Sequence, residues 1–263
     1  MAISAFAVPL KKAKLTVAGF EGTTTLENFP VLVRISETSI EGFNYSDCAE
    51  GGEDLSFALE DGSPLPYEID TWNDKGESLV WVKLPALSSA DHSFYMKWKD
   101  SQATENDPTD VWSDEYIGVW HMGGFNADNA VTDATGNGFN AKATSASIST
   151  AEGLCKVGAA VKNGEVTSSS SGGGLKVSDY ESRYSGSGVS FTCSAWIRLP
   201  ENADKTVNHM IFDKKLANGA SWDAVPGWFV QVLGKGLLKQ GISLKSFAFP
   251  RRVTRCWIKR QAI

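Results

Sequence analysis

The sequence is poor in histidine and cysteine and has no long apolar run, and each scarcity excludes a class of protein. The three histidines, His92, His121 and His209, have no H-x-x-E or H-x-H neighbour, so no metal site or catalytic triad is indicated. The four cysteines form no CxxC pair, which argues against a zinc site or a thioredoxin-like centre. No apolar run approaches the roughly 18 residues of a membrane-spanning helix. The chain itself is therefore expected to have no membrane span.

The first residues, MAISAFA, carry a small-x-small pattern of the kind cleaved after a secretory signal, although the apolar stretch before it is short and has no basic start. We interpret them as the tail of a signal peptide whose beginning is missing, with a frayed N-terminus as the alternative. The first interpretation predicts an extracellular or periplasmic protein. There the four cysteines can pair in three ways, and buried free thiols are the alternative; they are Cys48, Cys155, Cys193 and Cys256.

Negative charge is distributed unevenly along the 263 residues. The chain has 25 basic and 31 acidic side chains, and eight of the basic ones follow from Lys235 onward without a single acid, so the preceding residues carry a net charge of −14. An acidic body argues against a nucleic-acid surface.

Apolar residues alternate with polar ones, or form short runs of Val, Ile, Phe and Trp between Gly, Pro, Asp and Asn, which predicts strands and no helices. Six are expected in the first half, at 13–20, 29–36, 54–60, 65–72, 78–84 and 93–99. Further strands are expected at 116–122, 156–162, 175–178, 189–199, 208–214 and 227–233. The fold class is therefore all-β, with two β-sandwich domains at 8–100 and 113–234, a polar linker at 101–112 and a tail at 235–263.

Two successions of motifs point to known families. NFPVLVRIS, FNYSD, DLSFALEDGSPLPYEIDTWN and SLVWVKLPALS occur in this order in the first half, which resembles the family catalogued as domain of unknown function 2341. The second half, with GVWHMGG, DATGNGFNA and VSFTCSAWIRLP, is similar to the laminin-G-like jelly roll of the concanavalin A-like lectins and glucanases. These resemblances imply an exported bacterial surface or envelope protein. Such pairs of domains often occur in long proteins, some of which end in a TolQ/ExbB-type proton-channel domain.

The resemblance to the jelly roll ends too early. A laminin-G-like domain continues past GWFVQV with further strands, whereas residues 235–263 lose both the acidic character and the strand pattern. We interpret them as an aberrant tail of a truncated gene, poorly ordered or packed opportunistically; a basic tail that binds an anionic polymer or lipid is the alternative. The jelly-roll domain is then expected to be incomplete, with Trp196 meeting water.

The segment DATGNG opens like an EF-hand loop, with oxygen-bearing side chains at Asp133, Thr135 and Asn137 before Gly138. The pattern then fails, because position 12 is Thr144 in place of the bidentate Glu and no helices flank the loop. A tight turn with Asx hydrogen bonds is the favoured interpretation. Calcium bound through Asp133 and Asn137 is the alternative, and no other cofactor is expected.

The segment EIDTWN resembles the catalytic strand of laminarinase-type glucanases, since Glu68, Asp70 and Trp72 share one side of a strand. The third acid of that pattern is replaced by Trp72. A retaining glycosidase needs two carboxyl groups about 5 Å apart, and same-face neighbours on a strand are nearer about 7 Å. We therefore expect solvent-facing acids beside a half-buried tryptophan.

Tryptophan supplies the candidate ligand-binding residues, because an aromatic face stacks well on a sugar ring. Five tryptophans lie within expected strands and are assigned to the core: Trp81, Trp98, Trp120, Trp196 and Trp228. Trp112 and Trp222 lie outside them and are the exposed candidates. The sequence thus predicts a non-catalytic binding or adhesion module for a polysaccharide or a cell-surface protein. A glycoside hydrolase and a passive structural spacer are the alternatives.

Overall fold

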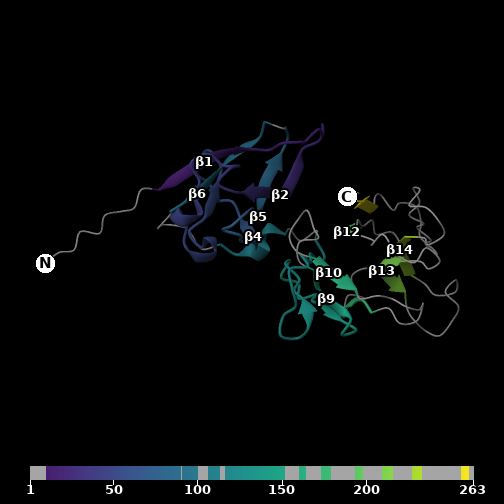
Figure 1. Ribbon diagram of the computed structural model, residues 1–263. Helices are drawn as coiled ribbons and strands as arrows, with labels where there is room; N and C mark the ends of the chain where they lie inside the picture. Colours follow the sequence, from purple (N-terminus) through teal and green to yellow (C-terminus); the bar gives the residue numbers. More distant parts are fainter. Residues whose placement is uncertain are drawn as a thin grey trace. The chain divides into compact units, whose positions relative to one another are not determined.

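The computed structural model describes residues 10–89, 91–99, 106–112, 116–151, 160–163, 173–178, 193–197, 209–215, 227–232 and 256–260. Regular structure in these residues is β-strand apart from three 3-10 turns, which confirms the all-β fold class (Figure 1). The chain divides into two compact units, residues 1–166 with 172–178 and residues 167–171 with 179–263. This division lies beyond the expected linker. Independent folding of residues 8–100 stays a prediction.

Two three-stranded antiparallel sheets form a β-sandwich in the first unit (Figure 1). One sheet has the order β1-β6-β3, with strands β1 (Lys11–Thr16), β6 (Ser93–Trp98) and β3 (Ser56–Ala58). The other has the order β2-β5-β4, with strands β2 (Leu26–Ile35), β5 (Ser78–Leu87) and β4 (Tyr67–Thr71). All six strands expected in this half are confirmed, with their ends shifted by a few residues.

The core lies between the two sheets because side chains alternate in and out along each strand. The inward residues of β5 and β6 are buried: Val80, Val82, Leu84, Phe94, Met96 and Trp98. Burying one such side chain contributes about 1.5–3 kcal/mol. The residues between them, Trp81 and Lys83 on β5 and Tyr95 and Lys97 on β6, are only partly buried and belong to the outer faces.

A buried hydroxyl pair fastens the connection between β2 and β3, which contains the 3-10 turns η1 (Tyr45–Asp47) and η2 (Glu50–Gly52). The Tyr45 hydroxyl donates to the Ile35 carbonyl at 2.8 Å, lies 2.9 Å from Ser78 Oγ and accepts from the Ser78 N–H at 3.1 Å. Burial raises the pKa of Tyr45. The neutral phenol therefore works as a structural hydrogen-bonding group.

Residues 106–112, part of the polar linker expected at 101–112, contact the first sandwich. The side chain of Asn106 accepts from the Tyr67 N–H at 3.0 Å and donates to the Tyr67 carbonyl at 2.7 Å, as a neighbouring strand would. The 3-10 turn η3 (Pro108–Val111) contacts β4 and β5, and Val111 is fully buried. This part of the segment therefore packs on the outer face of the β2-β5-β4 sheet.

The rest of the first unit contains short strands. One sheet has the order β11-β8-β7, and β10 pairs with β9; the bounds are β7 (Ala130–Val131), β8 (Ala141–Ala143), β9 (Ile148–Ala151), β10 (Ala160–Asn163) and β11 (Leu175–Val177). β10 and β11 confirm expected strands in shortened form. No strand forms at 116–122, where one was predicted, and β7, β8 and β9 were not predicted.

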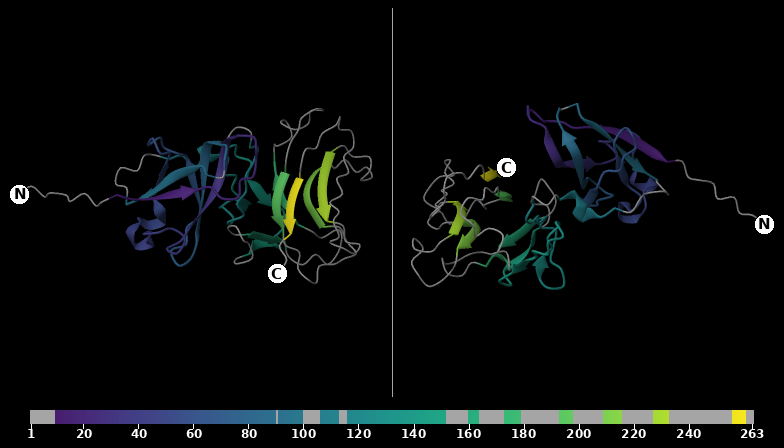
Figure 2. Two further views of the ribbon diagram at one scale, coloured as in Figure 1. Left: turned by 90° about the horizontal axis from the view of Figure 1, so that it is seen from above. Right: turned by 180° about the vertical axis from the view of Figure 1, so that it is seen from behind.

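The described residues of the second unit form two strand pairs, drawn in Figure 2. β13 (His209–Lys215) and β14 (Gly227–Val232) pair antiparallel, and β12 (Cys193–Ile197) pairs in parallel with β15 (Cys256–Arg260). β12, β13 and β14 confirm expected strands. β15 lies in the basic tail, so this part of the tail joins a sheet.

The buried hydroxyl pair yields a stability prediction. Tyr45→Phe leaves the Ile35 carbonyl and the Ser78 N–H without their shared partner, so we expect the free energy of unfolding to fall by about 1–3 kcal/mol. Urea denaturation measures it. Tyr95→Phe is the matched control, because that ring lies on an outer face, and it should change stability by less than about 0.5 kcal/mol. Equal losses in the two variants contradict the assigned role.

Candidate functional site

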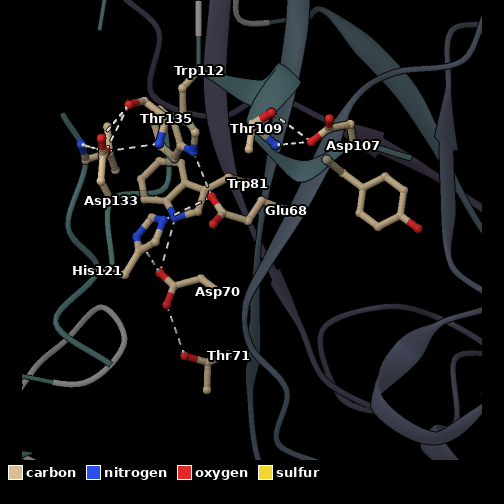
Figure 3. A network of polar contacts seen from close by, with 12 residues as sticks. Glu68, Asp70, Thr71, Trp81, Asp107, Thr109, Trp112, His121, Asp133 and Thr135 are labelled. Atoms are coloured by element: carbon tan, nitrogen blue, oxygen red, sulfur yellow. Dashed lines mark hydrogen bonds and ion pairs between the residues drawn. The ribbon is translucent and has the colours of Figure 1, made fainter. Parts of the chain in front are cut away.

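A cluster of polar and aromatic side chains covers the outer face of the β2-β5-β4 sheet (Figure 3). We call it the carboxylate cluster; its members are Glu68, Asp70, Trp81, Trp112 and His121. The two acids come from β4, Trp81 from β5, and Trp112 follows η3. His121 comes from the segment 116–122, which forms no ladder of its own. Residues far apart in the sequence therefore meet at one place on the sheet.

A β-bulge at Asp70 shapes the strand that carries the acids. Glu68 lies opposite Trp81 on β5, but the register shifts between Ile69 and Thr71. A bulge bends the strand and re-aims side chains. Beyond it Trp72 packs against the core of the sandwich, with its ring 5.2 Å from that of Tyr45. The expectation that Trp72 shares a face with the two acids is therefore wrong.

Glu68 is held by two donors on one oxygen. Its Oε2 accepts from the Trp112 indole N–H at 2.7 Å and lies 3.0 Å from His121 Nε2. The side chain is 15 % exposed. Its carboxylate is thus bound inside the protein, so the expectation of a solvent-facing acid is wrong for Glu68.

Asp70 is buried more deeply, with 3 % of its side chain exposed. Its Oδ2 accepts from the Trp81 indole N–H at 3.2 Å and lies 3.3 Å from His121 Nδ1, while Oδ1 accepts from the Thr71 hydroxyl at 3.3 Å. Both oxygens therefore face protein donors. The expectation of a solvent-facing acid is wrong here too.

The position of His121 between the two acids favours its protonated form. A neutral imidazole has one N–H and one lone pair, and the lone pair would face a carboxylate oxygen here. Burial lowers the pKa of His121, but the hydrogen bond to Glu68 and the charges of Glu68 and Asp70 outweigh burial, so its net pKa is raised. The cluster therefore holds an imidazolium between two carboxylates.

Aromatic rings enclose that imidazolium. The Trp81 ring stacks on the His121 ring, with centroids 6.2 Å apart and an interplanar angle of 25°. The Trp112 ring lies 5.6 Å from His121, and Tyr116 packs edge-on against Trp112 at 5.3 Å. Indole faces attract cations at about this distance. The rings and the two acids thus stabilise the same charge.

The predicted ligand-binding tryptophans have different outcomes. Trp112 is 8 % exposed, its indole N–H is bound to Glu68, and its ring contacts Trp81 and His121. The expectation that Trp112 is an exposed aromatic is therefore wrong, because packing covers its faces. Trp222 lies outside the described residues.

The backbone next to His121 is strained. Met122 has a φ of 60°. This left-handed conformation costs a residue with a side chain about 1–2 kcal/mol, and such strain persists only where the surroundings hold it in place. The contacts of His121 with Glu68 and Asp70 keep the neighbouring backbone at Met122 in this conformation.

The turn at Asp133 holds the segment that carries His121. Its carboxylate accepts from the backbone N–H groups of Val119, Thr135 and Phe139, each at 3.1 Å. The Thr135 hydroxyl lies 2.9 Å from both carboxylate oxygens, and the Ala134 N–H donates to the Val119 carbonyl at 2.8 Å. Asp133 thus organises its own turn and fixes the backbone two residues before His121.

This geometry favours the turn over a calcium loop. The Asn137 side-chain nitrogen donates to the carbonyls of Tyr116 and Ile117, both at 3.2 Å, and Gly136 and Gly138 have positive φ. Asn137 therefore uses its side-chain nitrogen to tie the turn to the segment that carries His121. In the described part of the chain, no three His, Cys, Asp or Glu side chains are placed to hold a metal. Calcium binding by Asp133 and Asn137 stays a prediction.

Comparison with known proteins connects this site to a family. Residues 51–133 match the model of a family described as Domain of unknown function (DUF2341). The match covers less than half of the chain, contains the whole carboxylate cluster and ends at Asp133. It supports the first of the two resemblances, and nothing in the comparisons supports the second, the laminin-G-like one.

No curated protein and no solved structure matches the chain. Among the described residues no helix has the length and apolarity needed to cross a membrane.

Sequence reasoning missed His121 because no histidine motif surrounds it. A usable signal was present in physical terms. Two acids on one strand of a sandwich need a cation if that face is covered. The apolar segment YIGVWHM carries one basic side chain, His121, which can supply that cation. The sequence does not show that residues 106–112 and 116–122 cover the outer face of the β2-β5-β4 sheet.

The raised pKa of His121 predicts how stability depends on pH. A histidine whose pKa is raised by folding contributes stability that is complete below its ordinary pKa of about 6.5 and is lost as the pH rises through the folded pKa. We expect the free energy of unfolding of the wild type to fall from about pH 6.5 upward, and His121→Gln to lack this component. Urea denaturation at a series of pH values measures it. His92→Gln should keep the component, and a variant at His121 that also keeps it contradicts the assignment.

The Asp133 turn yields a second prediction. Asp133→Asn weakens three charge-assisted hydrogen bonds, so we expect it to lower stability by about 1–3 kcal/mol equally in calcium chloride and in chelator. Thermal unfolding measures the effect. Asp128→Asn, at an exposed position, is the control and should be nearly neutral. A calcium-dependent stabilisation of the wild type that Asp133→Asn abolishes would support the calcium alternative.

Proposed function

We propose that this chain is a non-catalytic binding module of an exported bacterial surface or envelope protein, with a polysaccharide or a cell-surface protein as its partner. The observation that carries the proposal is Trp196 in β12, which is 53 % exposed. Ser194, two residues earlier, is exposed as well, while Ala195 and Ile197 are partly buried. β12 therefore presents an indole ring on its exposed side.

An exposed indole is a suitable surface for a sugar. It combines a large flat apolar face with one N–H donor, and a pyranose ring presents apolar C–H groups beside its hydroxyls. The assignment of Trp196 to the core was wrong, whereas Trp98 is buried as expected. The laminin-G-like resemblance of residues 113–234 supports a carbohydrate partner, since lectins share that fold.

The carboxylate cluster supports the non-catalytic part of the proposal. A glycosidase needs one carboxyl group to donate a proton and another to act as nucleophile or base at the sugar. Glu68 and Asp70 are mostly buried and bound by Trp112, His121 and Trp81. A glycoside hydrolase is the alternative, and a passive spacer of a channel-linked envelope protein is a second one.

Affinity electrophoresis in gels that contain different polysaccharides tests the proposal. We expect the wild type to be retarded by at least one neutral polysaccharide, and Trp196→Ala to weaken that affinity by up to about tenfold. Phe29→Ala, which removes an exposed aromatic from β2, is the matched control and should not change retardation.

Three outcomes count against the proposal. Unchanged binding in Trp196→Ala means that the exposed ring does not contact the polysaccharide. Release of reducing sugar that is lost in Glu68→Gln supports the hydrolase. Failure of the wild type to bind any polysaccharide or cell surface supports the spacer.

A further inference from the structure

The outer face of the β1-β6-β3 sheet gathers lysines around one aromatic ring. We call Lys12, Lys14, Tyr95 and Lys97 the lysine face. The register of β1 and β6 places Lys12 opposite Lys97 and Lys14 opposite Tyr95. Lys12 and Lys14 are exposed, Tyr95 and Lys97 are partly buried, and the Lys12 ammonium lies 5.2 Å from the centre of the Tyr95 ring.

The positive charge of this face is not neutralised within the described residues. Lys11 and Lys99 of the same region both pair with Asp47. No ion pair involves Lys12, Lys14 or Lys97 in the part of the chain that the structure describes, and no acid occupies β1, β6 or β3. Like charges directly opposite each other destabilise a sheet. The protein therefore carries a local cationic surface that lowers its own stability.

Protection of the sheet edge does not explain this surface. Lysines on edge strands prevent edge-to-edge aggregation, which accounts for Lys12 and Lys14 on β1. Lys97 lies on β6, the central strand of the sheet. Edge protection therefore does not account for Lys97, and Lys14 and the Tyr95 ring lie beside the opposed pair on this face.

We propose that the lysine face binds an anionic polysaccharide, whose carboxylate or sulfate groups meet the lysines and whose sugar rings contact Tyr95. This rests on the binding function proposed above, and it uses residues other than Trp196. Neighbouring strands lie about 4.8 Å apart, and the register of β1 and β6 places the three lysines around Tyr95 on one face of the sheet. An extended polymer can lie across such a surface.

The charge of the whole body favours a glycan over the other polyanions. The residues before Lys235 carry a net charge of −14. Duplex DNA has one phosphate charge per about 1.7 Å of its axis, so an acidic body with three local lysines repels it more than it attracts it. Anionic membranes recruit clusters of about four to eight basic residues. A polysaccharide with about one charge per sugar has the low charge density that three lysines can match.

A second opposed lysine pair provides a matched control. Lys142 on β8 lies opposite Lys176 on β11, both exposed. The double variants Lys12→Gln/Lys97→Gln and Lys142→Gln/Lys176→Gln remove the same charge from the two sheets. Affinity for polygalacturonate at low salt is measured by affinity electrophoresis.

The expected result is specific to one pair. The wild type should bind polygalacturonate, more weakly as salt rises. Lys12→Gln/Lys97→Gln should weaken binding by about tenfold and Lys142→Gln/Lys176→Gln by less than about twofold. Thermal unfolding should show that Lys12→Gln/Lys97→Gln is at least as stable as the wild type, because it removes a repulsion, so that lost binding is not lost folding.

Several results overturn the inference. The first is that the protein binds neither polygalacturonate nor dextran sulfate. The second is that the two double variants lose the same affinity for polygalacturonate. The third is that single-stranded DNA or phosphatidylserine vesicles bind more tightly than polygalacturonate and depend on the same lysines. Trp196→Ala separates this inference from the proposed function. Retardation by neutral polysaccharides that depends on Trp196, without any polygalacturonate binding, overturns only the lysine face. Lysine-dependent polygalacturonate binding that is unchanged in Trp196→Ala supports the lysine face alone.

Discussion

The pairing of His121 with Glu68 and Asp70 is the interaction on which the outer face of the β2-β5-β4 sheet depends. Two carboxylates on one covered strand are costly unless a cation and hydrogen-bond donors accompany them. His121 supplies the cation, and Trp81 and Trp112 supply the indole N–H donors. Because His121 and Trp112 come from later in the chain, satisfying the acids also fastens residues 106–112 and 116–122 onto the sandwich.

This arrangement gives the two acids an architectural role. Their hydrogen bonds to Trp112 and Trp81 and their contacts with His121 hold the covering segments on the sheet. The two surfaces for which we propose a partner are the exposed indole of Trp196 and the cationic outer face of the β1-β6-β3 sheet. One offers an apolar plane and the other offers charge. Both suit a polymer that lies across a sheet better than a small ligand in a closed pocket.

The six strands of the first sandwich follow from local pattern. Apolar and polar residues alternate along each strand, and this alternation indicates which side chains enter the core. The same reasoning failed for 116–122. Its apolar residues follow a strand pattern, yet the segment does not pair with a strand. Val119 donates to Asp133 and His121 contacts Glu68 of the carboxylate cluster. The expectation for Trp112 failed for a related reason. A tryptophan outside the strands was taken as exposed, but its ring packs against Trp81, Tyr116 and His121.

The sequence by itself determined the fold class, the six strands of the first sandwich and the turn at Asp133, since these depend largely on residues within a few positions of one another. Only the tertiary structure decided the environment of the acids. Glu68 and His121 are 53 residues apart in the chain. A contact at that separation depends on how the covering segment packs, and neither residue carries a motif that names the other. The sequence shows that Glu68 and Asp70 are two acids on one strand. Whether their carboxyl groups face water or a cation depends on how the covering segment packs.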